Sequence, residues 1–344
     1  MSPEQSVNLY SDTQTKPTPG MRKAMAEAEV GDEQRLLDPT VNELQERVAE
    51  LLGHEAALFL PSGTMCNAIA FRLHLRPGGD EAILDRTAHP VHYEAGSPAT
   101  ISHAMLKQLD GDGGVFTPEQ LEAAIHPKGD RYGPRSRLVS VEQTTNVGGG
   151  RVWPIDTVRG VLEVARRHDL RTHLDGARLM NAVVASGVPA ADYASRFDTA
   201  WVDFTKGLGA PVGAVLAGPR EVIDEAWRYK QMLGGAMRQA GIVAAGCLYA
   251  LDHHVERLAD DHANARALAA GLAELPGVDV DPGRVETNIV ICRVKQAAAV
   301  LRRLGEAGVQ ASPLDGDRIR CVTHLDVDRA GIERALTAFR EALR

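Results

Sequence analysis

Residues 201–213 read Trp-Val-Asp-Phe-Thr-Lys-Gly-Leu-Gly-Ala-Pro-Val-Gly, an apolar segment that runs into a glycine-rich turn at Lys206. Most lysines are solvated surface charges, and a turn lysine is one reading of this position. Glycines, however, let a ligand approach the backbone closely. A lysine amine held in a confined site can form a Schiff base with an aldehyde. The flanking pattern therefore favours a ligand-binding, covalently reactive role for Lys206.

A carboxylate follows another apparent strand upstream. His-Leu-Asp-Gly-Ala-Arg (173–178) places Asp175 at a strand end, one helical crossover before Lys206. A carboxylate at such a place can keep a pyridinium nitrogen protonated. Asp175 could equally cap a helix, but its pairing with Lys206 favours the cofactor role. Arg178 is either a surface charge or a clamp for a carboxylate or the cofactor phenolate.

A third motif, Ser62-Gly63-Thr64, follows the apolar segment 56–60 and precedes a helical pattern. Backbone amides at a helix N-terminus, with the hydroxyl groups beside them, can bind a phosphate. The same residues would also make an ordinary helix cap. Together, the three motifs predict pyridoxal 5'-phosphate bound at the carboxyl ends of a parallel sheet.

Histidines supply the remaining candidates. His89 lies in a polar loop after the segment 81–84, where an imidazole can stack on the cofactor ring and exchange protons near neutral pH. His92 is a weaker candidate in the same loop. His253, His254 and His262 lie on a charged helical stretch and are expected to be solvated.

Apolar strand-like runs alternate with helical patterns from residue 40 to 220, which predicts an α/β fold with a mostly parallel sheet covered by helices on both faces. The runs are 56–60, 81–84, 137–141, 171–174, 201–204 and 213–217. A long helical stretch (237–274) leads to a small C-terminal α+β domain. The expected units are an N-terminal arm with a short helix (1–30), a large cofactor-binding domain (31–246), and a linking helix with the small domain (247–344).

Composition limits the class of partner. The 344 residues carry a net charge of −8 and no basic run, which argues against nucleic acid and anionic membranes and favours a small molecule. The N-terminus lacks a leader pattern and no long apolar run occurs, so a cytoplasmic protein is expected. Four scattered cysteines predict neither a disulfide framework nor a metal site.

These features resemble the L-threonine aldolases, a group within the β-eliminating lyases and the aspartate-aminotransferase-like superfamily (fold type I) of pyridoxal phosphate enzymes. The likeness extends over nearly the whole chain. Its motifs are Leu-Tyr-Ser-Asp-Thr-Gln-Thr-Lys-Pro-Thr (9–18), Glu-Val-Gly-Asp (29–32), Asp-Pro-Thr-Val-Asn-Glu-Leu (38–44), Glu-Ala-Ala-Leu-Phe-Leu-Pro-Ser-Gly-Thr (55–64), His-Leu-Asp-Gly-Ala-Arg-Leu-Met-Asn (173–181), Lys-Gly-Leu-Gly-Ala-Pro-Val-Gly (206–213), Met-Leu-Gly-Gly-Ala-Met-Arg-Gln (232–239) and Ile-Arg-Cys-Val-Thr-His-Leu-Asp-Val (319–327).

The resemblance implies a role for each matching residue. Lys206 would bind the cofactor covalently, Asp175 would contact its ring nitrogen, and His89 would stack on the ring. Gly63 and Thr64 would bind its phosphate. The substrate carboxylate would be held by Ser11, Arg178 and Arg320, while Arg238 would reach the phosphate of a neighbouring subunit in a dimer or homotetramer.

Three positions differ from the family pattern, all near the expected substrate pocket. The stretch Gln34-Arg35-Leu36-Leu37 replaces one that carries a tyrosine, Thr145 replaces a second histidine, and Gln231 replaces a lysine. Thr145 leaves His89 or a water as the base for the substrate hydroxyl. Arg35 would either bind a second carboxylate, as in 3-hydroxyaspartate, or form an ordinary exposed ion pair.

The resemblance implies a carbon–carbon lyase that splits a β-hydroxy-α-amino acid into glycine and an aldehyde. Threonine, allo-threonine, phenylserine and 3-hydroxyaspartate are the candidate substrates. A β-eliminating lyase or dehydratase is the alternative on the same cofactor. A non-catalytic regulatory protein that binds the cofactor is a remote third reading, with no DNA-binding module or basic region to support it.

Overall fold

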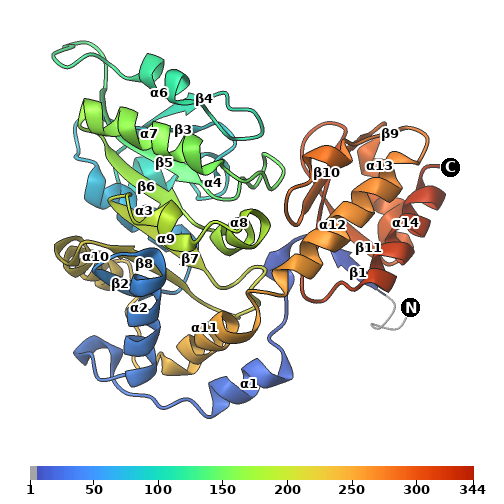
Figure 1. Cartoon of the computed structure of the whole chain (residues 1–344), viewed down its shortest axis with the longest axis horizontal. Coiled ribbons are helices and arrows are strands. Elements are labelled where there is room, and N and C mark those ends of the chain that lie inside the picture. The colour runs from blue at the N-terminus through green and yellow to red at the C-terminus, as the bar shows by residue number, and fades with distance from the viewer. Residues whose placement is uncertain (1–5) are drawn as a thin grey trace.

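The computed structural model describes residues 6–344 and contains two sheets (Figure 1). The larger sheet has seven strands in the order β2-β8-β7-β6-β5-β3-β4. Its strands are parallel except β8, which runs antiparallel to both of its neighbours. They are β2 (Ala56–Leu60), β3 (Asp80–Asp85), β4 (Met105–Leu109), β5 (Arg135–Glu142), β6 (Arg171–Asp175), β7 (Thr199–Asp203) and β8 (Ala214–Gly218).

Helices cover both faces of this sheet because alternate strand residues are apolar on each side. Phe59 and Val215 join one buried cluster with α2, α7, α8 and α9, whereas Leu58 and Leu216 join another with α3 and α10. The fold class predicted from the sequence is confirmed. The helices of this part are α2 (Pro39–Leu52), α3 (Gly63–His74), α4 (His89–His92), α5 (Ser97–Thr100), α6 (Pro118–Ala124), α7 (Ile155–His168), α8 (Leu179–Ser186), α9 (Ala190–Ala194) and α10 (Arg220–Met232).

The smaller sheet has the order β1-β11-β12-β10-β9 and packs against helices α12, α13 and α14 around a core of its own. Its strands are β1 (Val7–Leu9), β9 (Val278–Asp279), β10 (Ile289–Val294), β11 (Val309–Pro313) and β12 (Arg318–Val322). The helices are α12 (Leu258–Ala273), α13 (Ala297–Glu306) and α14 (Arg329–Ala342), and short 3-10 turns occur at η2 (Asp12–Gln14), η3 (Glu33–Arg35) and η4 (Pro282–Arg284).

The N-terminal arm joins the two parts of the molecule. Strand β1 pairs in parallel with β11 of the small sheet. The chain then crosses to the large sheet, where α1 (Pro19–Ala26) packs against α11 (Gly241–His253). The arm is therefore an edge strand of the C-terminal sheet, while the domain boundaries expected from the sequence stay a prediction.

Two expectations about the linking region were wrong. The helical stretch expected over residues 237–274 is two helices, α11 and α12, separated by a turn. His254 and His262 are buried, and only His253 of the three is exposed. His254 Nδ1 lies 2.7 Å from the Leu208 carbonyl, and His262 Nε2 lies 3.1 Å from Asn181 Nδ2. Both imidazoles are therefore hydrogen-bonded to residues that follow strands of the large sheet.

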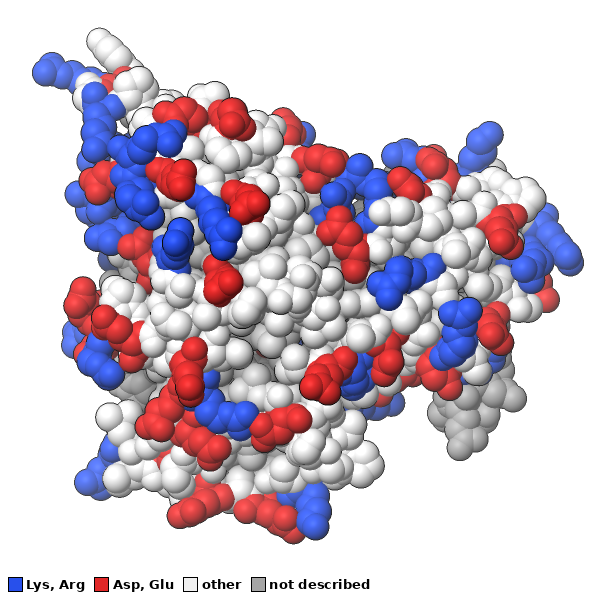
Figure 2. Space-filling view, viewed as in Figure 1, with Lys and Arg blue, Asp and Glu red and all other residues white. Residues whose placement is uncertain are grey.

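The surface mixes both signs of charge. Figure 2 shows acidic and basic side chains interspersed over the viewed face. Within residues 6–344, no helix has the length and the apolar character needed to cross a membrane.

Candidate active site

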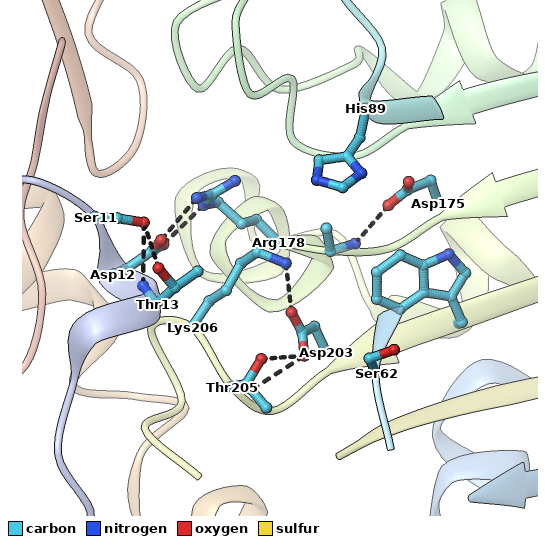
Figure 3. Close-up of polar contacts among 12 residues, drawn as sticks. Ser11, Asp12, Thr13, Ser62, His89, Asp175, Arg178, Asp203, Thr205 and Lys206 are labelled. Carbon is cyan, nitrogen blue, oxygen red and sulfur yellow. Dashed lines mark hydrogen bonds and ion pairs between the residues drawn. The ribbon is translucent and has the colours of Figure 1, made fainter. Parts of the chain in front are cut away.

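A cavity of about 400 Å³ opens where strands of the large sheet end and the small sheet approaches them. It is lined by all of the predicted site residues except Arg35, Thr145 and Arg238. Figure 3 shows Lys206, Asp175 and His89 approaching this space from three different segments. The predicted residues that line it are Ser11, Ser62, Gly63, Thr64, His89, Asp175, Arg178, Lys206 and Arg320.

Lys206 lies three residues beyond the end of β7, in a turn tied down on both sides. Its carbonyl accepts hydrogen bonds from Gly209 N at 2.9 Å and from Thr15 Oγ1 of the N-terminal arm at 3.0 Å. The Nζ atom donates to Asp203 Oδ2 and lies 5.8 Å from the centre of the Trp201 ring. The turn therefore presents the amine to the cavity instead of to solvent.

Asp175 ends β6 and is 1% exposed. Its Oδ2 accepts from Asn67 Nδ2 at 2.8 Å, and its Oδ1 accepts from Ala177 N at 3.1 Å. Burial raises the pKa of Asp175, and the hydrogen bond from Asn67 partly offsets this rise. The desolvated carboxylate is thus well placed to accept a hydrogen bond from a protonated ring nitrogen.

His89 begins α4 and is held by two glutamates. Its Nδ1 lies 2.9 Å from Glu94 Oε1, and its backbone N donates to Glu142 Oε2 at 2.7 Å. Burial lowers the pKa of His89, but the hydrogen bond to Glu94 and the charges of Asp175, Glu94 and Glu142 outweigh it and raise the pKa. Burial, with the charge of Asp175, raises the pKa of Glu142 to about 7.

The segment Ser62–Thr64 forms the start of α3 directly after β2. The Ser62 hydroxyl caps the helix by accepting from Met65 N at 3.3 Å. The amides at the first helical positions have no partner within a helix, so they can bind an anion. Gly63 packs closely against Trp201, where an added Cβ would lie 2.2 Å from a ring carbon. The close packing explains the glycine at this position.

Gly63→Ala is therefore expected to destabilise the protein by about 1–3 kcal/mol, the usual cost of overpacking a filled site. The Trp201 ring cannot move away freely, because its Nε1 donates to Asn67 Oδ1 at 2.8 Å. Denaturant unfolding measures the change. Gly305→Ala is the control: it lies on α13 with open space around its Cβ position, and we expect it to be neutral or slightly stabilising. Equal stability of the two variants would contradict the packing argument.

Two arginines of the cavity have different partners. Arg178 forms a bidentate ion pair with Asp12, at 2.7 Å for both contacts, and both residues are buried. Burial would raise the pKa of Asp12, but Arg178 outweighs it and holds that pKa well below its usual range. Arg320 donates from Nη1 to Asn146 Oδ1 at 2.6 Å, and its buried Nε has no partner among residues 6–344. Its Nη2 lies 3.5 Å from the Tyr10 carbonyl, and no described carboxylate pairs with it, so its charge is available to an anion.

The other predicted residues lie in different surroundings. Ser11 lines the cavity, and its hydroxyl accepts from Thr13 N at 3.2 Å and Thr13 Oγ1 at 2.8 Å. Thr145 is buried and lines a separate small cavity, and its hydroxyl accepts from Arg151 N at 3.1 Å. Arg35 is exposed on η3, and the exposed Arg238 pairs with Asp32 at 3.3 Å. The roles predicted for these residues stay predictions.

Several polar residues of the site were missed from the sequence. Asn67, Glu94, Glu142 and Asp203 are buried and bond directly to Asp175, His89 or Lys206. For Asp203 and Glu142 a signal existed, since both end apolar strands as Asp175 does. Asn67 and Glu94 lie in or near helical segments with no comparable mark.

The comparisons with known proteins agree with this geometry. A model of the family described as "Beta-eliminating lyase" matches residues 8–297. The chain belongs to the β-eliminating lyase family. It is therefore an enzyme of the lyase class.

Among its relatives, the low-specificity L-threonine aldolase 1 of Arabidopsis thaliana is 39% identical, over 98% of this chain and 96% of the relative. The low specificity L-threonine aldolase of Escherichia coli K12 is also 39% identical, over 98% of this chain and 99% of the relative. The structure of a Leishmania major threonine aldolase matches with a TM-score of 0.84 at 20% identity, covering 98% of this chain and 100% of the other. A putative L-allo-threonine aldolase from Listeria monocytogenes matches with a TM-score of 0.80 at 20% identity, covering 99% of this chain and 97% of the other. The structural matches show the fold alone.

Proposed function

We propose that this lyase binds pyridoxal phosphate and cleaves the Cα–Cβ bond of a β-hydroxy-α-amino acid such as L-threonine, giving glycine and an aldehyde. The observation that carries the proposal is one cavity that joins a lysine amine, a buried carboxylate and an arginine free of any described ion pair. The relatives named L-threonine aldolases support the reaction.

The residues present fit this cofactor. Lys206 offers its amine to the aldehyde, Asp175 a charge to the ring nitrogen, and the start of α3 its amides to the phosphate. Ser62, Gly63 and Thr64 line the cavity, so the first amides of α3 border the space that a phosphate would occupy. When bound, pyridoxal phosphate supplies an electron sink for the bond that breaks at Cα.

The protein's own groups orient the substrate and move its protons. Arg320 binds the substrate carboxylate, and Asn146 fixes the guanidinium by accepting from Nη1. Arg178 lines the same cavity, but its Nε and Nη2 are paired with Asp12, so only Nη1 is left for a ligand. We assign removal of the β-hydroxyl proton to His89, whose ring Glu94 holds at the cavity wall.

Arg320→Ala is expected to raise KM for the amino acid about 10- to 100-fold, with a smaller effect on kcat, because a charge-assisted hydrogen bond contributes about 1.5–3 kcal/mol. Steady-state kinetics measures both constants. Arg318→Ala is the matched control, since Arg318 lies on the same strand but pairs with Asp315. An unchanged KM in Arg320→Ala would remove Arg320 from the substrate site.

His89→Ala is expected to retain the cofactor and to lose about 10²-fold or more in cleavage rate, as when a positioned proton-transfer group is removed. The backbone bond from residue 89 to Glu142 survives the substitution, so the loop keeps its anchor. Because the environment raises the pKa of His89, the wild-type rate should increase with pH through that pKa as the imidazole loses its proton. Unchanged turnover, or an unchanged pH profile, in the variant would exclude His89 as the base.

A panel of amino acids with product identification tests the reaction itself. Threonine, allo-threonine, phenylserine and 3-hydroxyaspartate should give glycine and the matching aldehyde. Ammonia and a keto acid would instead identify a β-eliminating lyase or dehydratase. A strong preference for 3-hydroxyaspartate that Arg35→Ala abolishes would support a carboxylate-binding role for Arg35, and a strong preference for threonine would reject it.

We further propose that the enzyme is an oligomer whose subunits complete each other's phosphate sites. Exposed apolar side chains gather where segments 29–38 and 232–242 meet, joined by bonds from Gly31 N and Gly241 N to Asp38 Oδ2. They are Val30, Leu36, Leu37, Met232 and Ile242, and Arg35 and Arg238 lie in the same two segments. Such a patch is typical of a protein interface.

Mixing two inactive variants tests the shared site. Lys206→Ala and Arg238→Ala, refolded together, should form hybrids that regain part of the activity, because one site of each hybrid then holds both native residues. A monomer in solution by light scattering, or mixtures no more active than the parents, would contradict this arrangement.

A cytoplasmic location is also proposed. All four cysteines, Cys66, Cys247, Cys292 and Cys321, are buried free thiols, as expected in a reducing compartment. Cell fractionation with an antibody tests it, and recovery of the protein from an extracytoplasmic fraction would reject it.

A further inference from the structure

Asp203 is a buried carboxylate that lines the cavity together with Asp175 and Glu142. It ends β7, and its side chain is 2% exposed. Its Oδ1 accepts from Thr205 N at 3.1 Å and from Thr205 Oγ1 at 2.8 Å. These two donors fix the carboxylate so that Oδ2 faces Lys206 Nζ, as Figure 3 shows. Within the described residues, Lys206 is the one cation paired with Asp203.

The other ionisable groups around Lys206 have hydrogen-bond or ion-pair partners of their own. Asp12 is paired with Arg178, and Asp175 accepts from Asn67 and Ala177. His89 is bonded to Glu94, Glu142 binds two backbone amides, and Arg320 contacts Asn146. Burial raises the pKa of the Cys66 and Cys247 thiols, which are therefore neutral. The Lys206 ammonium thus has Asp203 as its ionic partner.

We propose that Asp203 is the positioning residue that holds Lys206 as an ammonium whenever its nitrogen is released from the cofactor. This inference rests on the proposed function. In that exchange the carbon–nitrogen double bond to Nζ breaks while one to the substrate nitrogen forms. The substrate ammonium gives up two hydrogens, and Nζ gains two and leaves as an ammonium. Asp203 stabilises this released form and keeps Nζ within reach for its return.

The geometry suits a holding site. Asp203 and Lys206 are three residues apart in one turn. The Lys206 carbonyl accepts from Thr15 and Gly209, which fixes the turn, so the two side chains meet without a change in the backbone. The face of Trp201, 5.8 Å from Nζ, adds a second favourable contact for a cation. A buried carboxylate without a cation beside it would raise the free energy of the folded protein, and this favours keeping the released ammonium next to Asp203.

Asp203→Asn is the sharpest variant, because an asparagine Oδ1 can still accept both bonds from Thr205 and only the charge is lost. The readout is the pH titration of the visible absorption band of the purified holoenzyme. Removing an opposite charge at this distance should lower the midpoint by about 1–3 pH units. Asp203→Glu retains the charge, and its midpoint should stay closer to wild type than to Asp203→Asn. Because Nζ is still attached in this form, an unchanged midpoint in Asp203→Asn overturns the proposal together with an unchanged reactivity of the free amine in the second measurement.

A second measurement does not depend on the cofactor. The protein is first stripped of cofactor and then treated with trinitrobenzenesulfonate, and peptide mass spectrometry follows the modification of Lys206. The rate of this reaction reports the fraction of Lys206 that is unprotonated. Asp203→Asn should accelerate this reaction about tenfold or more near neutral pH, because lowering an amine pKa by one unit raises the unprotonated fraction about tenfold. An equal rate would overturn the role of Asp203. If wild type shows no visible band, the proposed function fails, while this rate still decides whether Asp203 holds Lys206.

Discussion

Lys206→Ala should lose covalent attachment of pyridoxal phosphate and at least about 10³-fold in turnover, within the range for removing a positioned proton-transfer group. The amine is the attachment point, and once released as an ammonium it can supply the proton that Cα must gain to give glycine. The cofactor should still bind, because the start of α3 and Asp175 do not depend on Lys206. Borohydride reduction followed by mass spectrometry measures the attachment, and aldehyde release measures turnover.

Lys128→Ala serves as the control for a lost lysine. Lys128 is exposed on the loop after α6 and does not line the cavity. This variant should behave as wild type in both assays. Covalent attachment that persists in Lys206→Ala would place the reactive amine elsewhere and would remove the basis of the proposed function.

Asp175→Asn should keep the covalent cofactor but lower kcat by about 10²–10³-fold, the effect of removing one preorganised electrostatic group. Asparagine matches the shape of the native side chain and can still accept from Ala177 N. It lacks the charge that keeps a ring nitrogen protonated, so electrons from the breaking bond are drawn less strongly. The measurement is the steady-state rate together with the visible spectrum.

Asp169→Asn, the same change at an exposed position after α7, controls for the substitution itself. Its rate should equal that of wild type. A wild-type rate in Asp175→Asn would show that the ring nitrogen needs no anionic partner in this protein.

Much of the site could be predicted because its central residues follow apolar strands. Lys206, Asp175 and Ser62 each lie at or just after the end of a strand, and strand ends converge on one edge of a parallel sheet. The pattern of apolar runs also predicted the layers of the large domain. It omitted the edge strand β4, whose residues are only partly buried and carry little apolar periodicity.

Contacts between distant segments could not be predicted from the sequence. Asn67 donates to Asp175, 108 residues away in the chain, and no feature of the sequence around Asn67 predicts that this polar side chain is buried. The same limit explains the error at His254 and His262, whose charged helical neighbours predicted exposure although tertiary packing covers both rings. Motif position predicts Thr145 and Arg35 as site residues, but neither side chain lines the cavity.

The pairing of β1 with β11 has a consequence for how the enzyme is made. Val7 lies beside Val309, so the first and last parts of the chain must meet before the arm that carries Tyr10 and Ser11 can close the cavity. Contacts between residues so far apart in sequence form late in folding. A nascent chain that still lacks its last segment would also lack Arg320. Binding of the substrate carboxylate thus requires the segment that carries Arg320, and a chain cut short before it would have the cofactor residues Lys206 and Asp175 without that anchor.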